Sequence, residues 1–230
     1  MGKYSNNSNI RVNGNGNYIG GNVIDNRREY HHHHNKPPRR GDDANGEFAA
    51  IIFTALTVIW FYSKYAYEIY EYIKAGAFIS SILFMLVLAI GILYKPEETK
   101  LLYAASYGLL ISLITMLVAQ YGINNLDPRL VEIGQQSKNA WAFWSQLNAY
   151  GHQLIIGSLG GAVFSGITVI LSVLMSINLL WCAIADNYYE YEYIRRFLAP
   201  FRPSVAGVIS SVLVFFSWLF ISGNLFRVIS

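Results

Sequence analysis

Charged side chains are scarce in this chain of 230 residues. Asp, Glu, Lys and Arg make up 13% of it, against about 25% in a typical soluble domain. Hydrophobic residues make up 53%, and the combination excludes an ordinary soluble fold. Residues 1–46 hold seven Lys or Arg and four acidic residues, so this tail carries the whole net charge of +3. The body, residues 47–230, is neutral.

Residues for catalysis or metal binding are also few. The single cysteine, Cys182, excludes a disulfide framework and lacks the neighbouring Cys or His of a zinc or haem motif. No Ser-His-Asp, H-E-x-x-H or phosphate-loop pattern is present, and His152 is the one histidine outside the tail. In the first apolar run, Lys64, Glu68 and Glu71 come near the end, where the two glutamates indicate emergence into the head-group region. Elsewhere between the ends of the runs there is no Asp, Glu, Lys, Arg or His, which weighs against ion-coupled transport and a membrane-embedded hydrolase. We therefore expect no enzyme, no metal site and no cofactor.

Long apolar runs dominate the body. A bilayer core requires about 20 apolar residues, and five stretches approach or exceed that length: 48–72, 77–94, 101–121, 154–185 and 205–228. Only a short turn, Lys95-Pro96-Glu97-Glu98, separates the second from the third, which predicts an antiparallel hairpin. The expected fold class is an all-α integral membrane helical bundle of about five transmembrane helices, preceded by a short Asn/Gly-rich β-type segment.

The positions of Lys and Arg predict an orientation. Loops rich in these residues stay on the cytoplasmic side, and with five spans twelve of the seventeen fall on the side of the tail. This predicts a cytoplasmic N-terminus and an external C-terminus. Aromatic residues prefer the head-group zone, so we expect Tyr62, Tyr65, Tyr67, Tyr70 and Tyr72 to form a belt there.

Small and polar residues form a stripe in the fourth predicted span. Helical periodicity places them on one face, and two interpretations stay open. In the first, the stripe lines water in a pore made by several copies, with the candidates Ser158, Ser165, Thr168, Ser172, Ser176 and Asn178. In the second, small residues let two helix backbones approach closely, with the candidates Gly157, Gly161, Ala162 and Gly166.

The tail alternates β-branched or aromatic residues with Asn-Gly turn signals between Asn9 and Asn26. Strands of two or three residues cannot bury a core alone, whereas stacked copies can pair in register. This predicts an assembly segment, and a disordered Asn-rich linker is the alternative. The candidate assembly residues are Ile10, Val12, Tyr18, Ile19, Gly20, Gly21 and Val23.

The run Val-Asn-Gly-Asn-Gly-Asn-Tyr-Ile-Gly-Gly-Asn-Val, residues 12–23, resembles the short Gly/Asn motifs of bacterial amyloid-signalling and effector-recruitment segments. The resemblance extends over roughly 18 residues and does not reach the body. It implies a membrane effector of an anti-phage or cell-suicide system, located in the bacterial inner membrane and triggered by clustering through the tail.

A basic run comes after this motif, and its arginines, Arg27, Arg28, Arg39 and Arg40, are candidates for contact with anionic lipid head groups. The run lacks a phosphate-binding glycine loop and interleaved aromatics, so it is not typical of a nucleotide or nucleic-acid site. The expected partners are membrane lipid, further copies of the chain and a cytosolic sensor that reaches the tail.

These features favour a homo-oligomeric, channel-like membrane effector that permeabilises the membrane when triggered through its tail. The alternative is a non-conducting membrane anchor or assembly subunit that recruits a cytosolic partner.

Overall fold

The computed structural model describes residues 18–19, 22–23, 42–184, 196–197 and 199–223. The chain divides into two units, Met1–Ala49 and Ala50–Ser230. In the first unit, β1 (Tyr18–Ile19) pairs antiparallel with β2 (Asn22–Val23). The predictions for Ile10, Val12, Gly20, Gly21, Arg27, Arg28, Arg39 and Arg40 lie outside the described residues.

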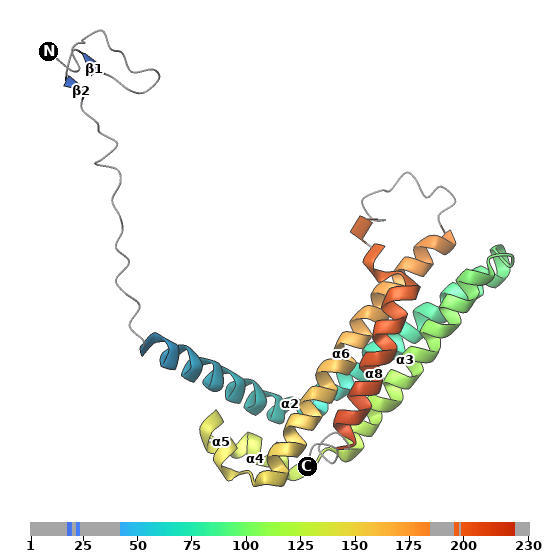
Figure 1. Ribbon diagram of the computed structural model, residues 1–230. Helices are drawn as coiled ribbons and strands as arrows, with labels where there is room; N and C mark the ends of the chain where they lie inside the picture. The colour runs from blue at the N-terminus through green and yellow to red at the C-terminus, as the bar shows by residue number, and fades with distance from the viewer. Residues whose placement is uncertain (1–17, 20–21, 24–41, 185–195, 198, 224–230) are drawn as a thin grey trace. The chain divides into compact units, whose positions relative to one another are not determined.

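Helices make up the second unit (Figure 1). Its elements are α2 (Asp42–Tyr94, which begins in the first unit), α3 (Thr99–Asn125), α4 (Pro128–Gln136), α5 (Ala140–Gln146), α6 (Ala149–Ile184), the 3-10 helix η1 (Ala199–Phe201) and α8 (Pro203–Ile221). Among the described residues, α2, α3, α6 and α8 are long and apolar enough to cross a membrane. The prediction of an all-α body with helices suited to crossing a membrane is confirmed, and among the described residues these helices number four where five were expected.

The difference arises because the predicted spans 48–72 and 77–94 are parts of one helix, α2. No proline interrupts the segment between them. The ammonium group of Lys74 donates hydrogen bonds to the carboxylate of Glu71, at 2.8 Å, and to the amide oxygen of Gln120, at 3.2 Å. At about 1.5 Å per residue α2 is about 80 Å long, whereas a bilayer core is about 30 Å thick. One helix this long therefore extends well beyond a single crossing.

A kink divides α2 at Tyr65, whose φ of −118° and ψ of 18° are not helical. After Tyr65 the helix runs with α3 and α6 in the bundle, whereas residues 50–64 leave the bundle (Figure 1). We call residues 50–64 the arm. Near its end, the indole of Trp60 donates a hydrogen bond to the carbonyl of Gly134 in α4, at 3.1 Å.

Sequence signals fix the ends of the other helices. α2 ends at Tyr94 and α3 starts at Thr99, so the predicted antiparallel hairpin at Lys95–Glu98 is confirmed. Asp127 caps α4 by accepting a hydrogen bond from the backbone of Arg129, and Asn139 caps α5 in the same way. After α8 comes Gly223 at φ 70°, a left-handed conformation that glycine adopts without strain.

Candidate functional site

The hydroxyl stripe lies inside the bundle formed by one chain. α6 packs along α8 and α3, and α2 contacts the same face of α6 through tyrosine hydroxyls. All six of the pore candidates are buried: Ser158, Ser165, Thr168, Ser172, Ser176 and Asn178. In this conformation they therefore contact other helices of the same chain.

Two tyrosines of α2 hold the start of the stripe. The hydroxyl of Tyr62 lies 2.7 Å from that of Ser158, and Tyr70 donates a hydrogen bond to the Ser158 carbonyl at 2.8 Å. Both tyrosines are buried, Tyr70 completely, whereas Tyr72 is 77% exposed. The belt predicted from five tyrosines therefore includes two that are core residues joining α2 to α6.

A second hydroxyl pair joins α6 to α8. The Ser165 and Ser217 hydroxyls are 2.6 Å apart, and Ser217 donates to the carbonyl of Gly161 at 2.8 Å. Because the Ser217 proton is used in this way, Ser165 is the donor of the pair. Both serines are fully buried, so the contact brings the two backbones close together.

The middle of the stripe is satisfied differently. Thr168 and Ser176 donate to backbone carbonyls of their own helix, at 2.8 Å in both cases. The hydroxyl of Ser172 is buried and has no hydrogen-bond partner among the described residues. Leaving a buried hydroxyl unpaired costs free energy, so Ser172 is the one stripe position where a polar group weakens the closed bundle.

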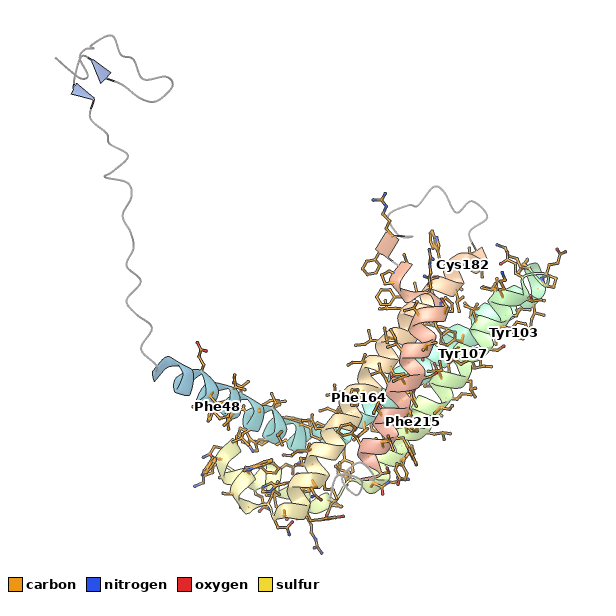
Figure 2. The ribbon with its side chains drawn as sticks, viewed as in Figure 1. Phe48, Tyr103, Tyr107, Phe164, Cys182 and Phe215 are labelled. Atoms are coloured by element: carbon orange, nitrogen blue, oxygen red, sulfur yellow. The ribbon has the colours of Figure 1, made fainter. Side chains whose placement is uncertain are left out.

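A further pair links α2 with α3, where the hydroxyls of Ser80 and Ser112 are 2.7 Å apart. On the outer side of α3, the Tyr107 hydroxyl lies 2.7 Å from that of Ser211 in α8. Figure 2 labels Tyr107 on α3 and Phe164 on α6. The ring of Phe164 lies 5.4 Å from that of Phe220, so aromatic contacts also help to join α6 to α8.

The packing candidates differ in their surroundings. A Cβ built on Gly161 would collide with the side chain of Ile221, which shows a close approach of α6 and α8. Ala162 and Gly157 are buried, but a Cβ on Gly166 would meet nothing within 4 Å. Sequence reasoning missed Gly108, where a Cβ would collide with the ring of Phe84.

A polar cavity of about 310 Å³ lies where α3 and α8 end and α6 begins. Its polar lining is uncharged and consists of Asn125, Tyr150, Gln153, Ser158 and Ser222. An apolar groove of about 460 Å³ lies between the arm and α6, lined by Thr57, Val58 and Phe61 from the arm and by residues such as Leu159 and Ala162 from α6.

Charge is absent from the buried interior that the structure describes. Every buried polar side chain there carries a hydroxyl or an amide, and the described residues contain no group of three His, Cys, Asp or Glu that could hold a metal ion. This part of the interior can form hydrogen bonds with itself or with water.

No protein-family model, curated protein or solved structure matches this chain. Its function is therefore inferred from the fold and from the contacts of the described residues.

Sequence reasoning also missed the roles of two tyrosines, which a helical periodicity could have indicated. Tyr62 and Tyr70 are eight residues apart, close to two helical turns, and therefore share a face with Ala66 and Ile73, which are also buried. That periodicity distinguishes them from Tyr65 and Tyr72. The choice of Ser158 as their partner depends on the packing of α2 against α6.

Proposed function

We propose that this chain is a homo-oligomeric effector of the bacterial inner membrane, closed in the described conformation, which opens a path for ions when its cytoplasmic tail clusters. One observation carries the proposal: the bundle is apolar outside and its interior holds uncharged hydroxyls, some of which pair across helix interfaces. The resemblance of residues 12–23 to amyloid-signalling motifs supports the tail as the trigger.

Hydroxyl pairs suit an interior that opens. A hydrogen bond between membrane helices is typically worth about 0.6 kcal/mol, and water replaces it without leaving a buried charge. Separating α6 from α8 at Ser165 and Ser217 would expose the stripe to water, and a wetted polar path conducts whereas a dry one does not. The unpaired hydroxyl of Ser172 favours the wetted state.

The four-helix arrangement changes the proposed orientation. If α2 crosses the membrane once, after Tyr65, both ends of the chain and the α4–α5 connection lie on one side. That side then holds twelve of the seventeen Lys and Arg, so the N-terminus stays cytoplasmic and the C-terminus is cytoplasmic too. The predicted external C-terminus required a fifth crossing. Reporter fusions after Ser230 separate the two arrangements.

The test locks the α6–α8 contact. In the background Cys182→Ser, the double variant Ser165→Cys, Ser217→Cys places two thiols where the hydroxyls are 2.6 Å apart, within reach of a disulfide. A chemically induced dimerising domain fused before Met1 clusters the tail in liposomes containing the full chain. We expect ion flux on clustering in the reduced double variant and in the Cys182→Ser parent, and at least a tenfold loss after oxidation of the double variant.

Two results would count against this function. Flux that persists after verified disulfide formation would place the path elsewhere. If the clustered parent never conducts, the alternative function, a non-conducting membrane anchor or assembly subunit, is favoured. One observation favours this alternative: within one chain, Ser158 pairs with Tyr62 and Ser165 pairs with Ser217. Helix packing alone explains both contacts.

A further inference from the structure

The polar cavity lies at the end of the bundle where α3 and α8 end and α6 begins (Figure 1). Its volume is about 310 Å³, and none of the described residues that line it is charged. Ser158, the first residue of the hydroxyl stripe, belongs to the lining. A ligand held in this cavity would therefore lie at one end of the stripe.

Two helix C-termini lie at the cavity, because α3 ends at Asn125 and α8 ends at Ile221, and both residues belong to the lining. The last carbonyls of a helix carry a partial negative charge. The N–H of Leu126 donates to the carbonyl of Ile123, which leaves the carbonyl of Gly122, another lining residue, without its usual i+4 donor. Both helix ends therefore favour a cation in the cavity.

Side chains add further neutral oxygens to the lining. The amide nitrogen of Asn125 donates to the carbonyl of Tyr121 at 2.8 Å, so its amide oxygen remains as an acceptor. Gln153 supplies a second amide and Tyr150 a hydroxyl, and both side chains are exposed. Neutral oxygens replace the hydration shell of potassium in channels, whereas calcium and magnesium sites use carboxylates. The lining therefore suits a monovalent cation better than a divalent one.

The N-terminus of α6 lies at the same end of the bundle and would by itself favour an anion. Its first turn is already capped, because the side-chain oxygen of Asn148 accepts a hydrogen bond from the N–H of Gly151 at 2.8 Å. The described lining contains no Lys, Arg or His. An anion would therefore meet two negative helix ends without a charged donor.

We propose that this cavity binds a monovalent cation of the size of potassium, through the carbonyl end of α3 and the amide oxygens of Asn125 and Gln153. Binding itself does not require conduction. The role of the bound ion rests on the proposed function: in the proposed orientation the cavity faces the cytoplasm, and Ser158 connects it to the stripe. The cavity is then the entrance of the path, and the permeating ions are monovalent cations.

Thermal unfolding measures binding without measuring flux. A ligand that binds only the folded state raises the unfolding midpoint. The purified full chain is unfolded in neutral detergent, in potassium chloride and in the chloride of the bulky cation N-methylglucamine at equal ionic strength. We expect a higher midpoint in potassium, and a shift at least threefold smaller in the double variant Asn125→Leu, Gln153→Leu.

The matched control is the double variant Asn124→Leu, Gln135→Leu. It removes the same two kinds of side chain from exposed positions outside the lining and should keep the full potassium shift. A second variant, Gln153→Glu, adds a carboxylate with little change in size. It should increase the potassium shift and produce a shift with calcium, so the proposal is tested even if the double variant of the lining does not fold.

Three results would overturn the site. The first is a parent midpoint that does not depend on potassium. The second is an equal shift in the parent and the folded variant of the lining, or no change in Gln153→Glu. The third is a shift that follows the anion when chloride is replaced at constant potassium, which would assign the cavity to an anion.

Ion flux after clustering tests the role of the cavity in conduction. In liposomes with a gradient of potassium chloride, we expect the reversal potential to follow potassium, and Asn125→Leu, Gln153→Leu to lower the flux at least threefold. Binding without any flux would refute the effector function but not the site. Flux of chloride together with potassium binding would refute the role as entrance, and potassium flux without binding would refute only the site.

Discussion

The bundle and the arm use similar apolar residues in opposite ways. In the bundle, small and hydroxyl-bearing side chains face inward, and large apolar side chains such as Leu117 and Phe215 face outward. In the arm, large apolar side chains surround the helix, and its small residues lie on an exposed face. Every long helix of the bundle has partners in its own chain, whereas Ile51, Phe53 and Val58 of the arm are more than half exposed.

The comparison shows what drives packing in a membrane. Lipid is as apolar as leucine, so large side chains gain little by leaving it, and helices associate where small residues allow close contact. The bundle meets this condition within one chain, for example where Gly76 approaches Val169 so closely that a Cβ would lie 2.6 Å from it. In the arm, the small residues Ala50 and Thr54 lie exposed.

The largest expected difference comes from one substitution made in both regions. Ile155 is fully buried in the bundle, whereas Ile52 is on the arm and 44% exposed. We expect Ile155→Ala to lower the free energy of unfolding by about 2 kcal/mol because it leaves a cavity, and Ile52→Ala by less than about 0.5 kcal/mol. Unfolding of the purified chain in mixed detergent micelles measures both. Equal losses would mean that the arm is packed within its own chain.

A smaller effect is expected at two glycines. Gly108→Ala forces a methyl group against the fully buried ring of Phe84 and the end of the Met175 side chain, and should cost about 1–3 kcal/mol. Gly166→Ala is the matched control, because its added methyl group meets nothing within 4 Å. The same unfolding assay applies. A tolerated Gly108→Ala would contradict the close approach of α2 and α3.

Removal of one tyrosine hydroxyl should have an effect of about 1 kcal/mol. Tyr70→Phe loses the hydrogen bond to the Ser158 carbonyl, whereas Tyr72→Phe removes a hydroxyl that is exposed. We expect a loss of stability only for Tyr70→Phe. If both variants unfold like the parent, the α2–α6 contact does not depend on this bond.

The smallest effects distinguish paired from unpaired serines. Ser165→Ala should cost about 0.6 kcal/mol, because it removes the donor to Ser217. Ser172→Ala removes a buried hydroxyl without a partner among the described residues and should leave the closed bundle as stable as before or more stable. The two variants are compared in one unfolding series, and a larger loss at Ser172 would show that its hydroxyl is satisfied.

Most of the fold could be predicted from the sequence because membrane spans are a local property. The runs 101–121 and 154–185 correspond closely to α3 and α6, and the turn at Pro96 ends α2 where proline and charge predict it. The sequence predicted two spans, 48–72 and 77–94, where the structure has one helix. The two were separated because Glu68 and Glu71 were interpreted as the point where the chain leaves the membrane. Glu71 and Lys74 instead satisfy each other on a continuous helix.

The candidate site was predictable only in part. Helical periodicity placed Ser158, Ser165 and Ser172 on one face, and the structure confirms that they share a buried surface. Whether that surface met water or protein depended on its neighbours, Tyr62, Tyr70 and Ser217, which are 52 or more residues away in the chain. No local pattern identifies such partners.

Composition and periodicity alone determined that this chain has helices long and apolar enough to cross a membrane, a neutral body, a basic tail and a hydroxyl face on α6, because apolar length, charge and helical phase depend only on local sequence. Tertiary structure decided that α2 is continuous through the tyrosine-rich segment and that the hydroxyl face is closed against α2 and α8. It also decided that the arm stays uncovered. These outcomes depend on which helices approach one another, and that is set by the close fit of small residues between distant segments.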